Sequence, residues 1–107
     1  MECAEQVVGW LRRNLGLEAA IKEPNDVFVA GRKISGILVE QVDGKLVMGV
    51  GLNTNLMPSD LGEEIAATSV YEQTGEKCDN KTVARELSQL IYASLNEGFP
   101  SPGDKDR

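Results

Sequence analysis

Near the start of the chain, apolar side chains recur three or four positions apart, which is the spacing of one helical face. The pattern predicts a helix over residues 2–15, ended by Gly16, because glycine readily takes the left-handed conformation that closes a helix. Arg12 and Arg13 fall among the polar positions of this segment. The apolar positions are Cys3, Val7, Trp10, Leu11 and Leu15.

A different pattern follows, in which short β-rich segments alternate with turn residues. Turns are predicted at Pro24-Asn25-Asp26 and Gly31-Arg32, and Asp43-Gly44 is typical of a two-residue hairpin that needs positive φ angles. The middle of the chain is therefore predicted to be an antiparallel β-meander. Its predicted strands are residues 18–22, 27–30, 33–42 and 45–53.

Helical spacing returns in the last third of the chain. The longest predicted helix covers residues 80–96, with Asp79 or Asn80 as its cap and Val83, Leu87 and Leu90 on its apolar face. The preceding segments are predicted to be a loop over 54–64 with a short helical turn at 58–61, a helix over 66–74 and a break over 75–77.

Helices on both sides of a meander predict an α+β domain with the sheet packed against helices, in place of a doubly wound fold. A chain of 107 residues suffices for one such domain. We expect the domain to cover residues 1–97 and residues 98–107, rich in proline and charge, to form a disordered tail.

Composition narrows the functional classes. The net charge of −6 argues against a nucleic-acid partner bound through a basic surface, and the absence of histidine removes that residue from every catalytic or metal hypothesis. Cys3 and Cys78 form no C-x-x-C pair, so we expect two reduced, partly buried thiols. No apolar run approaches the roughly 20 residues of a membrane span, and no signal peptide is visible. A cytoplasmic protein is expected.

The strand over residues 45–53 carries the first candidate chemistry. Because side chains alternate, Leu46, Met48, Val50 and Leu52 face one way, and Gly49, Gly51 and Asn53 face the other. Two glycines leave the second face bare, so a flat ligand could approach the backbone, and the Asn53 amide suits the edge of an adenine. The alternative is that the glycines accommodate a packed helix or a bulge.

Four further positions have two interpretations each. Lys22 stands beside a rigid turn and could neutralise a carboxylate or phosphate, or could be an ordinary solvated charge. Gly36 lies within a β-branched strand and marks a close approach or a bulge. Glu40 and Asp43 could in principle bind magnesium, although solvated carboxylates give the same pattern.

The order of these motifs is more specific than any one of them. The chain contains Lys22-Glu23-Pro24-Asn25-Asp26, then Lys33-Ile34-Ser35-Gly36-Ile37-Leu38-Val39-Glu40, then Gly49-Val50-Gly51-Leu52-Asn53-Thr54-Asn55, then Ala67-Thr68-Ser69. This succession resembles the C-terminal half of the catalytic domain of biotin protein ligases, over roughly residues 7–96. Lipoate ligases share the fold but lack the Gly-x-Gly-x-Asn strand.

The resemblance implies a partial class II synthetase-like domain and a reaction. Such ligases use ATP, with Mg2+, to form biotinyl-AMP and then transfer biotin to a lysine of a carrier protein. By resemblance, Lys22 is the catalytic residue that contacts the biotin carboxylate and the phosphate, and Asn53 contacts adenine. The other implied substrate- and nucleotide-binding positions are Asn25, Asp26, Gly36, Ile37, Gly49 and Gly51.

The chain also departs from the family pattern. The Gly-Arg-Gly-Arg-x-x-Arg loop and the SH3-like domain are absent, and Glu23 replaces the usual tryptophan. We therefore expect a chain that is inactive in isolation. It would be half of a split ligase with a complementary partner or a homodimer, a binding module without catalysis, or a vestigial product. An exposed apolar surface is expected at Val27, Val29, Ile37 and Val39.

Overall fold

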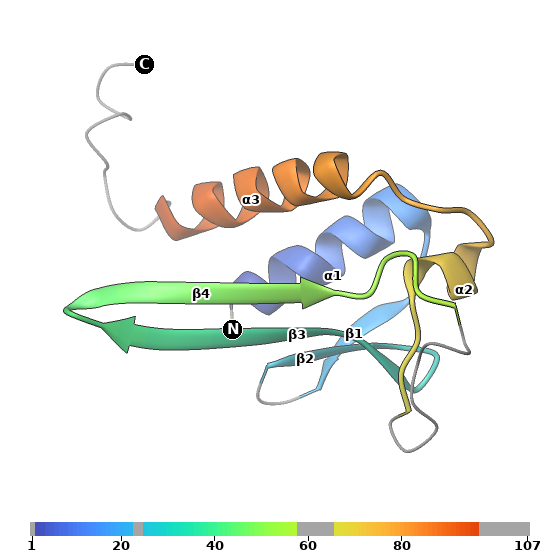
Figure 1. The fold of residues 1–107 in the computed structure, drawn as a ribbon, viewed down its shortest axis with the longest axis horizontal. Coiled ribbons are helices and arrows are strands. Elements are labelled where there is room, and N and C mark those ends of the chain that lie inside the picture. The colour runs from blue at the N-terminus through green and yellow to red at the C-terminus, as the bar shows by residue number, and fades with distance from the viewer. Residues whose placement is uncertain (1, 23–24, 58–65, 97–107) are drawn as a thin grey trace.

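The computed structural model describes residues 2–22, 25–57 and 66–96. The predicted 58–61 turn, the 98–107 tail and Glu23 lie outside these residues. The elements confirm the α+β prediction (Figure 1). They are α1 (Glu2–Leu15), β1 (Ala19–Lys22), β2 (Asp26–Val29), β3 (Arg32–Val42), β4 (Lys45–Leu52), α2 (Val70–Thr74) and α3 (Asn80–Asn96).

The four strands form one antiparallel sheet in the order β1-β2-β3-β4, so the predicted meander is confirmed. The β2–β3 and β3–β4 hairpins each have a two-residue turn, and all four turn residues have positive φ. Asp43 and Gly44 have φ angles of 51° and 75°, and Ala30 and Gly31 have 53° and 75°. Asp and Gly take this conformation readily, whereas alanine takes it at a cost.

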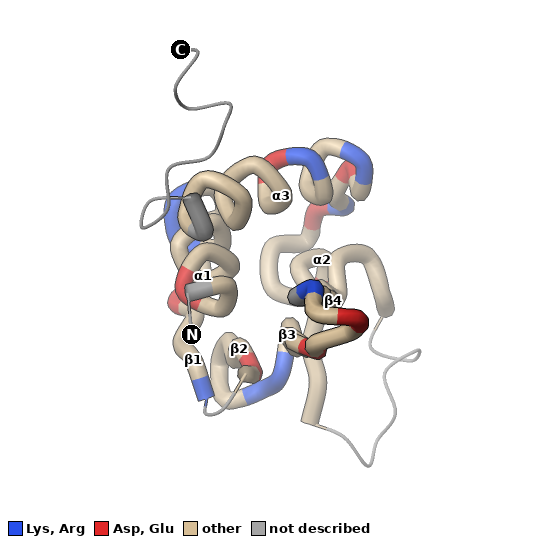
Figure 2. Tube along the Cα trace, turned by 90° about the vertical axis from the view of Figure 1, so that its left-hand side faces the viewer, with Lys and Arg blue, Asp and Glu red and all other residues tan. Residues whose placement is uncertain are grey.

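The core lies between the sheet and the long helices, which cover the same side of the sheet (Figures 1 and 2). Helix α1 packs against β1, β2 and α3, and its predicted apolar face is buried. The Trp10 indole, 5% exposed, donates a 2.8 Å hydrogen bond to Glu86 of α3. Among the described residues, no helix is long and apolar enough to cross a membrane.

The predicted helix over 66–74 is wrong in its first half. The Lys33 amide donates to the Ala66 carbonyl at 2.8 Å, and the Thr68 amide donates to the Lys33 carbonyl at 2.8 Å. The segment is therefore extended and docks beside β3, and only Val70–Thr74 is helical. Bonds to another strand override a local helical preference, because they satisfy the same backbone groups.

The predicted exposed apolar surface is also wrong for three of its four residues. Val27, Val29 and Ile37 are 0%, 4% and 6% exposed, because they point into the core beneath α1, and Val39 is half-buried. The exposed apolar side chains of the sheet are instead Leu38, Val42 and Val47. Their direct pairings, Leu38 with Gly49 and Val47 with Glu40, place Leu38 and Val47 on the opposite face.

Candidate functional site

Four of the predicted site residues form one row across the whole sheet. Lys22 of β1 pairs with Asp26 of β2, Asp26 with Gly36 of β3, and Gly36 with Gly51 of β4. Directly opposed residues point to the same face of a sheet. The row therefore runs along the face of the sheet that points away from the helices, the open face, and it aligns Lys22 with Gly51, 29 positions apart in sequence.

The glycines keep this face bare. A Cβ at Gly51 would lie 3.8 Å from the Gly36 carbonyl oxygen, and one at Gly49 would lie 4.0 Å from the Leu38 Cβ. No described helix packs against these glycines, and the sheet irregularity lies between Val27 and Phe28. The alternatives of a packed helix or a bulge therefore do not account for Gly49 and Gly51.

Phe28 and Lys33 lie beside the row and were not among the site residues predicted from the sequence. The irregularity gives β3 one extra residue, Ile34, since Val27 pairs with Ser35 but Phe28 pairs with Lys33. An extra residue reverses the alternation, so Lys33 shares the open face with Phe28, while Ser35 is 3% exposed. No simple pattern in the strand marks the position of this bulge.

These residues set the charges of the open face. The Lys22 Nζ lies 4.8 Å from the centre of the Phe28 ring, a cation–π distance, and the Lys33 Nζ lies 3.3 Å from the Asp26 Oδ1. The Lys33 side chain also lies over Gly36, where a Cβ would come within 3.3 Å of its Cε. Two ammonium groups and one carboxylate thus stand at one end of the glycine row.

Asn25 and Ile37 lie next to the row without extending it. The Ile37 amide donates a 2.9 Å hydrogen bond to the Asn25 carbonyl, which ties the end of the first turn to β3. The Ile37 side chain belongs to the core. Both residues therefore hold the row in place through the backbone, and a direct ligand contact remains a prediction.

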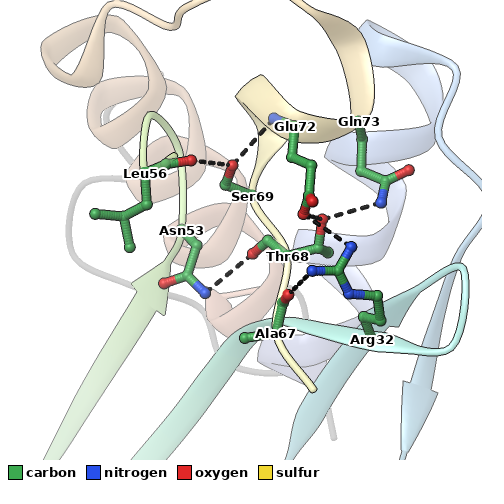
Figure 3. Close-up of polar contacts among 8 residues, drawn as sticks. All are labelled: Arg32, Asn53, Leu56, Ala67, Thr68, Ser69, Glu72 and Gln73. Atoms are coloured by element: carbon green, nitrogen blue, oxygen red, sulfur yellow. Dashed lines mark hydrogen bonds and ion pairs between the residues drawn. The ribbon is translucent and has the colours of Figure 1, made fainter. Parts of the chain in front are cut away.

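Asn53 is fixed at the other end of the site. Its amide donates to the Ile34 carbonyl, and its carbonyl accepts from the Val70 amide, both at 2.9 Å. Its side-chain Nδ2 donates to the Thr68 carbonyl at 3.1 Å (Figure 3). One Nδ2 hydrogen and the Oδ1 are left to meet a ligand, since no described residue donates to Oδ1.

An ion pair supports the segment that holds Asn53. Arg32 lies 2.9 Å from the Glu72 carboxylate and also donates to the Ala67 carbonyl (Figure 3). The Thr68 hydroxyl donates to Glu72 at 2.6 Å. The Thr68 hydrogen bond, followed by those from Arg32, holds the pKa of the Glu72 carboxyl below its usual value. Glu72 therefore accepts these bonds as a carboxylate at neutral pH.

The described residues contain no group of three or more His, Cys, Asp or Glu side chains that could hold a metal ion. Glu40 and Asp43 are both exposed. Cys3 is buried, Cys78 is half-buried, both are free, and burial raises the pKa of each thiol. The chemistry available to the open face therefore consists of lysine ammonium groups, the Asp26 carboxylate, one amide and exposed backbone.

The family model of the biotin/lipoate A/B protein ligase family matches residues 2–55 of the chain. The chain belongs to this family. It is 33% identical over 91 residues to the bifunctional ligase/repressor BirA of Bacillus subtilis, covering 78% of this chain and 28% of that protein. It is 30% identical over 105 residues to the biotin–[acetyl-CoA-carboxylase] ligase of Mycobacterium tuberculosis, covering 84% and 39%.

Solved ligases of the family have the same fold. The biotin protein ligase of Aquifex aeolicus in complex with biotin and ATP superimposes with a TM-score of 0.80 at 33% identity, over 89% of this chain. The match covers 41% of that chain. The protein thus spans less than half the length of the relatives it matches, and it corresponds to part of a ligase fold.

Proposed function

We propose that this chain is the adenylate-binding half of a cytoplasmic biotin protein ligase. The whole enzyme would form biotinyl-AMP from biotin and ATP and transfer biotin to a lysine of a carrier protein. A partner, either a complementary ligase half or a second copy of this chain, would supply the rest of the pocket. The single observation that carries the proposal is the Lys22–Asp26–Gly36–Gly51 row.

The row suits this ligand for a physical reason. In the reaction, a carboxylate oxygen attacks the α-phosphorus of ATP and displaces pyrophosphate, so two anionic groups must approach each other. Lys22 would lower that repulsion, and its position on the Phe28 ring restricts where the ammonium can lie. The bare backbone at Gly49 and Gly51 leaves room for the ligand to lie flat on the sheet, next to the Lys33 side chain that lies over Gly36.

The remaining roles are proposed from the family resemblance, and the geometry supports them. Asn53 would contact adenine at the end of β4, and Asn25, Asp26 and Ile37 would hold or line the site through the first turn and β3. ATP supplies the adenylyl group that activates the carboxylate, and magnesium would be held by the ATP phosphates, since the described residues offer no cluster of ligands. The amine of the carrier lysine then attacks the acyl carbon, and AMP leaves.

A non-catalytic binding module is the second candidate, favoured by one observation. The open face continues beyond the row into the apolar side chains of Leu38 and Val47, which are 60% and 49% exposed. An exposed apolar patch of this kind is typical of a surface that binds another protein. In that case the chain would bind a ligand or a protein without forming an adenylate.

The test is an amide-shift titration of the chain with ATP–magnesium and then with a non-hydrolysable biotinyl-adenylate analogue. We expect shifts centred on Lys22, Gly49, Gly51 and Asn53. Lys22→Ala should weaken binding of the analogue, whereas Lys45→Ala, an exposed lysine at the start of β4, should leave it unchanged. An absence of shifts at millimolar ligand would overturn the proposal and favour the protein-binding module.

A further inference from the structure

The orientation of the Asn53 carboxamide has a consequence for base selection. Its Nδ2 faces the Thr68 carbonyl oxygen at 3.1 Å, and that oxygen can only accept a hydrogen bond. A flip of the amide would place Oδ1 against this carbonyl, so that two acceptors would face each other. The geometry therefore favours one of the two amide orientations, with Oδ1 left to face a ligand.

We propose that Arg32, Thr68 and Glu72 are positioning residues that hold Asn53 in the orientation that accepts adenine and rejects guanine. The proposal rests on the proposed nucleotide site, and it adds the residues that determine base specificity. None of the three needs to touch the nucleotide. They act through the Thr68 carbonyl, which sets the direction of the Asn53 amide.

Thr68 is held from three sides. Its amide donates to the Lys33 carbonyl of β3 at 2.8 Å, and its side chain is fully buried. Its hydroxyl donates to Glu72 at 2.6 Å and accepts from the Gln73 Nε2 at 2.9 Å. Arg32 then joins Glu72 to the Ala67 carbonyl, one residue before Thr68 (Figure 3). The carbonyl that faces Asn53 is thus part of a cross-linked segment.

The locked amide matches adenine in particular. On its Watson–Crick edge, adenine presents an amino donor next to a ring-nitrogen acceptor, which pair with Oδ1 and the remaining Nδ2 hydrogen of an asparagine. On the same edge, guanine presents a carbonyl oxygen where adenine has its amino group and an N–H where adenine has its ring-nitrogen acceptor, so Oδ1 would meet another acceptor. A freely flipping amide could satisfy either base, whereas a fixed one leaves guanine with an unpaired polar group and is selective.

The first test needs no nucleotide. In the whole chain, one Nδ2 proton of Asn53 should give a cross-peak to Thr68 in a nuclear Overhauser spectrum, and its chemical shift should differ from that of a free asparagine amide because it is bonded to the Thr68 carbonyl. Thr68→Val keeps the shape of the side chain but removes both hydroxyl bonds, and it should weaken this cross-peak and move the shift toward the free-amide value. Arg32→Gln, at a half-exposed position, serves if Thr68→Val does not fold. A free-amide shift without the cross-peak to Thr68 in the unmodified protein would overturn the positioning role.

The second test compares binding of ATP–magnesium and GTP–magnesium. The unmodified chain should prefer ATP, and Thr68→Val should reduce the ATP-to-GTP affinity ratio about tenfold, the scale of one bidentate amide–base pair. Ser69→Ala is the matched control, because Ser69 caps α2 and binds the Leu56 carbonyl in the same segment without contacting Asn53. A merely structural role would lower the ratio equally in both variants, and that result would overturn the proposal.

The outcomes separate this inference from the proposed function. The Asn53–Thr68 cross-peak without binding of either nucleotide would refute the nucleotide site, and adenine selection with it, while the fixed amide would stand. Binding of both nucleotides with an unchanged ratio in Thr68→Val would refute the positioning role and leave the nucleotide site intact.

Discussion

The β3–β4 ribbon has two parts with opposite character. Its inner end, residues 32–37 and 50–53, carries part of the row and Asn53, and it is bonded to β2 and to the segment before α2. Its distal arm, residues 38–49, extends beyond β2 and exposes Leu38, Val42 and Val47 (Figure 1). The candidate site thus lies where the sheet is best supported, because a ligand pocket needs side chains held in fixed positions.

The difference shows that one strand can serve both stability and association. Along β3, exposure changes from 0% at Ile34 to 60% at Leu38 within four residues. The inner end gains its stability from this chain alone. The distal arm is left with an apolar face that its own chain does not cover, which is consistent with the proposed partner.

The largest expected effect is on stability, and it should differ between the inner end and the distal arm. Ile34→Ala should lower the free energy of unfolding by about 2–5 kcal/mol, because it removes a fully buried side chain at the inner end. Leu38→Ala on the distal arm should change it by less than about 0.5 kcal/mol, since that side chain is mostly exposed. Urea unfolding of both variants measures the difference. Equal losses would mean that the arm is also part of the folded core.

A smaller effect on the free energy of unfolding is expected at the two turns of the ribbon, one before the inner end and one at the tip of the distal arm. Ala30, in the turn before the inner end, has a φ of 53° without the side chain that favours it. Ala30→Asn should therefore raise the free energy of unfolding by about 0.5–1 kcal/mol, because asparagine tolerates this conformation. Asp43→Asn in the distal turn should have no measurable effect. Thermal unfolding tests both, and destabilisation by Ala30→Asn would contradict the strain argument.

The smallest expected effect is on the pH dependence of stability, and it involves only the inner end. The pKa of Glu72 is lowered in the folded protein, so its contribution to stability is present above the usual value of 4.5 and is lost as pH falls below it. Lowering the pH from 5 to 3 should therefore reduce the midpoint temperature of thermal unfolding, and the reduction should be smaller in Glu72→Gln than in the unmodified protein. Glu40→Gln, at an exposed position on the distal arm, is the control and should follow the unmodified protein.

Much of the fold was predictable from local pattern. The helix over 2–15, the four strands, the Asp43-Gly44 hairpin and the helix over 80–96 were each confirmed to within about two residues. These elements are specified by periodicity and turn chemistry, which act over a few neighbouring residues. The motifs that carried the family resemblance lie on these same elements, and the family itself was confirmed.

The site was predictable only in part. Alternation along β4 predicted that Gly49 and Gly51 would leave a bare face, and the structure has that face. The placement of Lys33 was not predictable, because it depends on one extra residue in the pairing of β2 with β3. The exposed apolar surface was assigned to the wrong residues for a similar reason, since only the packing of α1 decides which face of β2 is covered.

The sequence by itself determined the family, the order of the elements and the residue types available for chemistry. Tertiary structure alone decided that Lys22, Asp26, Gly36 and Gly51 stand in one row, and that residues 66–69 dock as an extended segment against Lys33. The physical reason is that the register of a sheet and the partners of a buried carbonyl depend on contacts between distant residues. Local preference cannot specify such contacts, because each residue can satisfy its backbone in several ways.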